Sequence, residues 1–180
     1  SLLLGLFRRL VGPTGLDLVR QVFGEMMEQN VQFVLLGSGD WQYEKFFREA
    51  VSYYPNRVSV TLGFDEDLAH KIYSGVDCFL MPSKNEPCGL SQMIALRYGT
   101  IPIVRSTGGL RDSVRDFGGE NGNGYDFQTY NPYDMLDAIH RCYSHFQDKG
   151  RWESHIQTAM DCHFRWGKPA NQYIALYKRI

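Results

Sequence analysis

The sequence predicts an α/β protein with a doubly wound, mostly parallel six-stranded sheet. Short, continuously apolar runs recur along the chain, and such runs are typical of strands buried on both faces. Longer segments with apolar residues at helical spacing separate them, as in a series of βαβ units. The length of 180 residues suits one core, so we expect a single domain over residues 1–180.

Six apolar runs predict the strands, the last being the weakest. They cover Leu2–Leu6, Gln32–Leu36, Val58–Leu62, Cys78–Met81, Ile101–Val104 and Gly124–Phe127. The helices expected between them cover Gly15–Gln29, Tyr43–Val51, Asp67–Ser74, Leu90–Tyr98 and Leu110–Arg115. After Phe127 the pattern is helical, so residues 132–180 are expected to form a helical C-terminal segment on a Rossmann-like sheet.

Composition narrows the class of function. Lys and Arg number 19 against 20 for Asp and Glu, and the formal net charge is −1. A nucleic-acid-binding domain would be basic, with clustered Lys and Arg, so we expect no nucleic-acid partner. Phosphate-bearing small molecules need only local cations and are compatible with this charge.

The first residues do not resemble a membrane segment. The apolar run Leu2–Leu6 contains Gly5, is far too short to span a bilayer, and precedes its basic residues, which is the reverse of a secretory signal. We therefore expect no membrane partner. Because the chain begins abruptly on this strand-like run, we expect it to be a fragment of a longer protein.

The cysteines indicate neither a metal site nor a disulfide framework. They are far apart, form no CxxC pair, and have no His at ligand spacing: Cys78, Cys88, Cys142 and Cys162. We expect reduced thiols and a cytoplasmic location.

Ligands of open α/β sheets bind outside the carboxyl ends of the strands, where helix N-termini present free amides. A site is therefore expected in the strand-to-helix loops, which cover Arg8–Gly15, Gly37–Asp40, Gly63–Asp67, Pro82–Leu90 and Arg105–Leu110. In the second loop, Gln42 stands where a GxGxxG fingerprint needs its third glycine. A tight turn is thus favoured over dinucleotide binding.

The fourth and fifth loops carry a family resemblance. The run EPCGLSQMIALRYGTIPIVRSTGGLRDSV, from position 86, resembles the carboxyl-terminal domain of bacterial glycogen synthases and plant starch synthases. Further matches are GLDLV, FVLLGSGD, GFDEDLAHKIYSGVDCFLMPS and GNGYDF, so the resemblance spans nearly the whole chain.

The resemblance implies one half of a glycosyltransferase-B fold, the half that binds the nucleotide sugar. The implied partners are ADP-glucose or UDP-glucose as donor, an α-1,4-glucan as acceptor, and a missing amino-terminal domain of the same enzyme. It also implies that neither a metal nor another cofactor is needed, and that a plant or algal protein would lie in the plastid. The isolated chain is expected to be inactive.

In the fourth loop, the resemblance assigns Glu86 to the donor sugar and the backbone amides of Cys88, Gly89 and Leu90 to the donor phosphate and sugar, with Ser91 beside them. Taken alone, Glu86 would more readily be explained as complementing the dipole of the following helix, whereas the motif favours the contact with the sugar. In related glycosyltransferases a second Glu often follows eight residues after the first. Ile94 stands there instead, which agrees with the starch-synthase pattern.

The first loop departs from the family pattern SRLxxQKGLDL. Arg9 matches the arginine that contacts the donor diphosphate, but Thr14 replaces the lysine and offers one neutral hydrogen bond. Losing one charged donor costs about 2.7–4 kcal/mol of transition-state stabilisation, so transfer could be weakened or absent. Arg8 could compensate, but adjacent strand residues point to opposite faces, so only one of Arg8 and Arg9 is expected to be well placed. A solvated surface charge is favoured for Arg8.

Two further loops leave alternatives open. Phe64 matches the position where the family stacks an aromatic ring on the donor base, and ordinary packing is an equal alternative. Asp65 precedes an amphipathic run, which favours a helix N-cap over a metal ligand. Thr107 and Gly108 match a loop near the donor phosphates or base, with a plain helix-start turn as the alternative.

A rival from another class is a noncatalytic nucleotide- or glucan-binding module. The replacement of the lysine by Thr14 is consistent with it.

Overall fold

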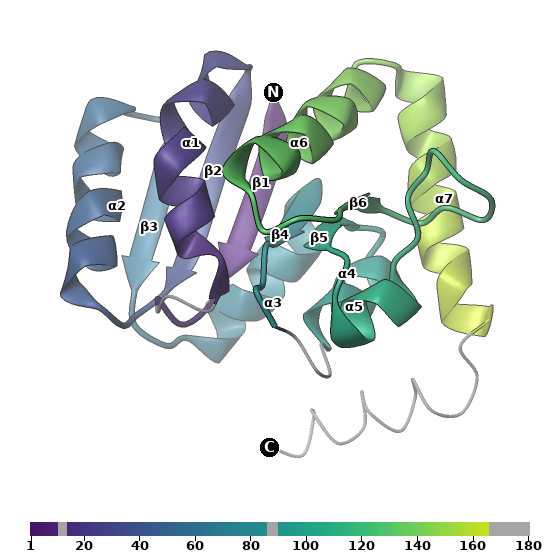
Figure 1. Cartoon of the computed structure of the whole chain (residues 1–180), viewed down its shortest axis with the longest axis horizontal. Helices are drawn as coiled ribbons and strands as arrows, with labels where there is room; N and C mark the ends of the chain where they lie inside the picture. Colours follow the sequence, from purple (N-terminus) through teal and green to yellow (C-terminus); the bar gives the residue numbers. More distant parts are fainter. Residues whose placement is uncertain (11–13, 86–89, 166–180) are drawn as a thin grey trace.

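In the computed structural model, residues 1–10, 14–85 and 90–165 are described. A parallel six-stranded sheet with the order β3-β2-β1-β4-β5-β6 forms its centre (Figure 1). The strands are β1 (Leu2–Phe7), β2 (Val31–Gly37), β3 (Val58–Leu62), β4 (Cys78–Met81), β5 (Ile101–Arg105) and β6 (Tyr125–Phe127). All five neighbouring pairs are parallel, so the predicted fold class is confirmed.

Helices cover both faces of the sheet. One face lies under α1 (Leu16–Glu28), α2 (Trp41–Tyr53) and α6 (Pro132–Phe146), and the other lies under α3 (Glu66–Gly75), α4 (Ser91–Arg97) and α5 (Gly108–Ser113). The last helix, α7 (Lys149–Arg165), lies at the β6 end of the sheet and contacts α4, α6 and β5. Within the described residues, α6 and α7 account for the predicted helical segment from residue 132 onward.

Side chains point alternately to the two faces of the sheet along each strand, and this divides the core into two layers. On β4, Cys78 and Leu80 face the α1–α2–α6 side, whereas Phe79 and Met81 face the α3–α4–α5 side. All four side chains are at most 1% exposed. Strands buried on both faces need apolar residues at every position, which is why the runs are continuous.

Predicted element boundaries differ from the observed ones by a few residues. The shift at α5 is two residues, since the helix begins at Gly108 rather than Leu110 and so includes both glycines. Similarly, α2 begins at Trp41 rather than Tyr43, because the Asp40 carbonyl accepts the N–H groups of Tyr43 and Glu44.

Side chains cap two of the helices. The Asp65 carboxylate accepts a hydrogen bond of 3.1 Å from the Leu68 N–H at the start of α3, which confirms the predicted N-cap. Asn131 does the same for α6, accepting from the N–H groups of Tyr133 and Asp134, with Pro132 at the first helical position.

The cysteines in the described part of the chain are free thiols in the core: Cys78, Cys142 and Cys162. The sulfurs of Cys78 and Cys142 lie 2.8 Å apart between β4 and α6. Burial raises the pKa of the Cys78 thiol well above its ordinary value, so it stays protonated. Cys88 lies outside the described residues.

Among the helices described, none has the length and hydropathy that a bilayer crossing requires.

A histidine pair joins α6 and α7 to β6. The Tyr125 hydroxyl lies 2.7 Å from Nδ1 of His145 and 3.3 Å from Nδ1 of His155. The Phe117 ring stacks on His155 with centroids 3.6 Å apart. Burial, aided by the positive charges of His145 and Arg151, lowers the pKa of His155 to about 4.

This pKa predicts acid sensitivity of the folded state. In the unfolded chain the imidazole of His155 binds its proton near pH 6.5, while in the folded protein it resists protonation down to about pH 4. The free energy of unfolding should therefore fall as pH drops through this window. Chemical denaturation measures this free energy at each pH. Between pH 7.5 and 4.5 it should fall less for His155→Phe, which keeps an aromatic ring beside Phe117, than for the wild-type protein. Equal slopes in both proteins would contradict the prediction.

Candidate functional site

In an open α/β sheet a ligand is expected where the strand order reverses, which here is between β1 and β4. From β1 the chain proceeds to β2, and from β4 it proceeds to β5 on the opposite side. The loops that follow these two neighbouring strands define the expected ligand crevice. These loops are residues 8–15 and 82–90, at the edge to which the arrowheads of β1 and β3 point in Figure 1.

The two loops touch at Gly15, immediately before α1. Gly15 has φ of 84°, in the left-handed region that favours glycine. A Cβ added there would lie 2.0 Å from the carbonyl oxygen of Pro82. Only a residue without a side chain lets the backbone of the first loop approach the fourth this closely.

Arg8 connects the same two loops through its side chain. Its Nη2 donates a hydrogen bond of 2.5 Å to the Ser83 hydroxyl, and the side chain is half-buried. The expectation of a solvated surface charge is therefore wrong. Strand alternation does not set the direction of the Arg8 side chain, because β1 ends at Phe7.

Arg9 and Thr14 flank residues 11–13, which lie outside the described residues. The side chain of Arg9 is exposed. The Thr14 hydroxyl donates to the Arg9 carbonyl oxygen at 3.2 Å. The structure thus links Thr14 to the backbone of Arg9, and the contact of both residues with a diphosphate stays a prediction.

A further cation, Arg105, reaches the fourth loop from the end of β5. Its Nη1 donates to the carbonyl oxygens of Lys84 at 2.5 Å and Ser83 at 3.5 Å. Its guanidinium lies 5.7 Å from the centre of the Tyr130 ring, and the Lys84 ammonium lies 5.6 Å from the same ring. Arg8, Lys84 and Arg105 therefore give this edge of the sheet a positive potential.

Tyr130 ties these cations to α1. Its hydroxyl donates a hydrogen bond to the Asp17 carboxylate in the first turn of α1. Burial and the negative charge of Asp17 raise the pKa of the Tyr130 phenol, so it stays a donor. Tyr130, Lys84 and Asp17 were not predicted from the sequence, since 113 residues separate the hydrogen-bonded pair. The only local signal is a tyrosine directly before the α6 cap.

The start of α4 is held from α3 and α5. The Ser91 and Tyr73 hydroxyls lie 2.9 Å apart, and the fully buried Gln92 donates to the Ser113 hydroxyl at 3.0 Å. Leu90, directly before the helix, is half-buried. The predicted site residues Glu86, Cys88 and Gly89 lie outside the described residues.

The fifth loop leads into α5 through an extended residue and a glycine. Thr107 has φ of −146° and makes no capping hydrogen bond through its side chain, while Gly108 has φ of 47°. Gly108 is exposed and Thr107 half-buried. Their proposed contact with a ligand stays a prediction.

Phe64 lies beyond the end of β3, with its ring 6.2 Å from that of Phe7 at the end of β1. The side chain is 78% exposed. An exposed ring beside the crevice is geometrically suited to stacking on a base, whereas its contact with Phe7 is ordinary packing. Stacking on a ligand stays a prediction.

Within residues 1–10, 14–85 and 90–165, no cluster of three or more His, Cys, Asp or Glu side chains is arranged to hold a metal ion. Asp65 acts as a helix cap there, as described above.

Comparisons with known proteins identify relatives of this sheet and crevice. The profile of the family described as "Glycosyl transferases group 1" matches residues 3–153. Glycogen synthase from Bacillus cereus is 50% identical over 180 residues, which are 99% of this chain and 38% of that protein. Glycogen synthase from Geobacillus stearothermophilus is 48% identical, with 99% of this chain and 37% of that protein covered.

Solved structures share the fold. The catalytic domain of starch synthase IV from Arabidopsis thaliana, bound to ADP and acarbose, superposes with a TM-score of 0.86 at 39% identity. The match covers 99% of this chain and 38% of that one. Anabaena HepE in complex with UDP-glucose superposes with a TM-score of 0.75 at 18% identity, covering 99% of this chain and 49% of that one, which extends the likeness in fold. The chain spans 38% of the length of the Bacillus cereus relative.

The contact between the two loops gives a prediction about stability. Gly15→Ala combines a left-handed backbone, at about 1–2 kcal/mol, with a clash against the Pro82 carbonyl, at about 1–3 kcal/mol. The melting temperature should fall by about 4–20 °C, since each kcal/mol shifts it by about 2–4 °C at this size. Gly75→Ala is the matched control, because a Cβ there meets nothing within 4 Å. Equal melting temperatures for the two variants would show that the loops do not need this approach.

Proposed function

Because this chain belongs to the glycosyl transferase group 1 family, we propose that it is the carboxyl-terminal, donor-binding domain of a glycogen or starch synthase. The whole enzyme would transfer glucose from ADP-glucose, or UDP-glucose, to the nonreducing end of an α-1,4-glucan. The observation that carries the proposal is the 50% identity to a glycogen synthase over 180 residues. The starch synthase IV structure is bound to ADP, which favours ADP-glucose as the donor.

The Bacillus cereus relative is much longer than this chain, which covers 38% of it, and this supports a two-domain enzyme. Residues 1–180 would form one nucleotide-sugar-binding domain, and an amino-terminal domain would supply much of the acceptor site. Turnover would then need both domains and closure of the cleft between them, which excludes water and completes the site. The isolated chain would bind nucleotide at best.

The chemistry of a retaining transfer sets what this domain must supply. As the bond to the departing diphosphate breaks, negative charge grows on its oxygens and positive charge develops at the anomeric carbon. Fixed donors aimed at those oxygens lower the barrier. Arg9 would present a planar fork to the diphosphate, while Arg8, Lys84 and Arg105 would add positive potential from the neighbouring strand ends.

The other contacts follow the family pattern residue by residue. Glu86 would accept hydrogen bonds from donor sugar hydroxyls, and the amides of Cys88, Gly89 and Leu90 would hold phosphate and sugar. Ser91, Thr107 and Gly108 would line the donor site, and Phe64 would stack on the base. Thr14 would stand weakly in the place of the lysine.

No metal or other cofactor is needed in this proposal, because the arginines and the amides meet the charge on the diphosphate. The thiols of the core suit a reducing compartment, so we place the protein in the cytoplasm, or in the plastid if its source is a plant or an alga.

Calorimetry of the full-length protein with ADP, UDP and maltooligosaccharides tests the proposal. We expect ADP or UDP to bind, and glucose to be transferred from the matching nucleotide sugar to a maltooligosaccharide. Binding of glucan without either nucleotide would refute the proposal and favour the noncatalytic glucan-binding module, the rival with which Thr14 is also consistent.

A pair of variants locates the binding. Arg105→Gln should weaken nucleotide binding about tenfold, in the range of one charge-assisted hydrogen bond. Arg97→Gln, which removes an exposed charge from the last turn of α4, should leave it unchanged.

Thr14→Lys tests whether the departure from the family pattern limits the rate. If the missing charge is a true deficit, transfer should rise, by at most about 100–1,000-fold, which is the effect of one donor to the developing anion. Thr158→Lys adds the same charge on α7 and should not change the rate. An unchanged rate for Thr14→Lys would mean that another cation already does this work.

A further inference from the structure

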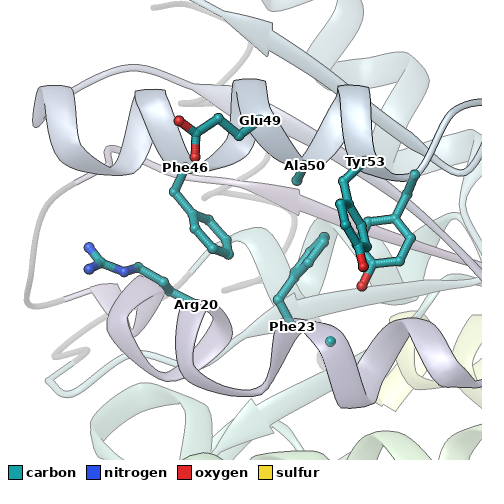
Figure 2. Close-up of a pocket in the computed structure, with 8 residues that line it drawn as sticks. Arg20, Phe23, Phe46, Glu49, Ala50 and Tyr53 are labelled. Carbon is teal, nitrogen blue, oxygen red and sulfur yellow. The ribbon is translucent and has the colours of Figure 1, made fainter.

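The groove between α1 and α2 contains a hollow of about 280 Å³. Figure 2 shows its lining, which includes Arg20, Phe23, Phe46, Glu49 and Tyr53. The rings of Phe23, Phe46 and Tyr53 project into the space between the two helices. None of these residues belongs to the crevice at the strand ends.

A glycine in the middle of α1 makes room for the hollow. A Cβ added to Gly24 would meet only the Tyr54 hydroxyl, at 4.0 Å. The helix also departs from helical geometry two residues earlier, at Val22, with φ of −115° and ψ of 16°. Glycine in a helix interior is destabilising relative to alanine, yet no close neighbour here demands it. What it provides is open space.

Aromatic rings form a fixed floor and an exposed wall. Phe23 is 3% exposed and meets Phe46 and Tyr54 edge to face, with centroids 5.7 and 5.9 Å apart. Tyr53 is 78% exposed, with its ring 4.8 Å from that of Tyr54. Such rings offer large rigid apolar faces whose positions are set before a ligand arrives.

Opposite charges stand on the two helices at the rim. The Arg20 guanidinium on α1 lies 5.9 Å from the centre of the Phe46 ring, and Glu49 comes from α2. Glu49 also lies 4.0 Å from Lys45, an exposed pair that water screens. The lining therefore carries one cation and one anion, besides the hydroxyls of Tyr53 and Tyr54, and has no net charge. Such a lining suits an uncharged ligand with hydroxyls better than a phosphate.

We propose that this hollow binds a glucosyl unit of an α-1,4-glucan. A pyranose ring has an apolar C–H face for the aromatic rings and hydroxyls for Arg20 and Glu49. The volume of about 280 Å³ is just below the usual range of about 300–1,000 Å³ for ligand pockets, which fits one sugar and not a nucleotide. This inference rests on the proposed function, because a glucan-extending enzyme works on a polymer that can occupy two places at once.

The position of the hollow gives it a role in holding the polymer. Arg20 and Gly24 follow the first residue of α1 by four and eight residues, so they lie about 6 and 12 Å along the helix from the crevice edge. A glucan anchored there keeps its other branches at high effective concentration near the crevice. Short acceptors cannot use both places.

Electrophoresis of the full-length protein through gels containing glycogen tests the proposal. Gly24→Leu fills the hollow while improving helix propensity, and Tyr53→Ala removes an exposed ring. We expect both variants to lose glycogen affinity by about two- to tenfold and to keep the wild-type rate with maltotriose as acceptor. The matched controls are Gly75→Leu, at an open helix end, and Tyr98→Ala, at an exposed tyrosine on another face.

The outcomes separate this inference from the proposed function. Unchanged retardation of Gly24→Leu and Tyr53→Ala would overturn the glucan site, as would equal losses in the controls. A loss of transfer to maltotriose in these variants would also overturn it, because the effect would then not be confined to the hollow. A wild-type protein that binds no nucleotide would overturn the proposed function. The retardation measurements would still show whether the hollow binds glucan.

Discussion

The parallel pairing of β1 with β4 is the constraint on which the rest of the structure depends. This pairing is short: Leu4 pairs with Cys78 and Gly5 with Phe79. Asp77 extends it, because its N–H donates to the Leu3 carbonyl and its carboxylate accepts from the Leu3 N–H, both at 2.8 Å. After this pair the chain continues to β2 on one side and to β5 on the other, so the strand order reverses here. A ligand crevice is expected at this point because these two strands are neighbours.

The chemistry of the crevice comes from side chains that the fold collects from distant parts of the chain. Arg8 reaches Ser83, and Arg105 reaches the backbone of the same loop. The Tyr130 ring lies beside Lys84 and Arg105, and its hydroxyl bonds to Asp17. Each cation is thus fixed by a hydrogen bond or a ring before any ligand arrives. Fixed charges of this kind stabilise a developing anion without the cost of reorganising during the reaction.

Sequence patterns predicted the features that depend on neighbours along the chain. Continuous apolar runs predicted the parallel strands, and Asp65 before an amphipathic segment predicted the cap of α3. Arg8 was misjudged because the alternation rule was carried one residue past the end of β1. The bond between Tyr130 and Asp17 depends on tertiary structure, so no local pattern could indicate it. The hollow beside Gly24 was hidden for the same reason, since a helical glycine reveals its use only when the facing helix is known.

The order of the elements along the chain also bears on how the protein is made. The face of β4, β5 and β6 that carries Leu80, Ile103 and Tyr125 is covered by α6 and α7, which follow every strand in the sequence. During translation this apolar surface is complete before its cover has left the ribosome. A nascent chain that ends before residue 132 therefore presents the kind of surface that chaperones bind and that promotes aggregation. Slow synthesis or premature termination near β6 would be more harmful than the same event after α1, where the exposed sheet is smaller.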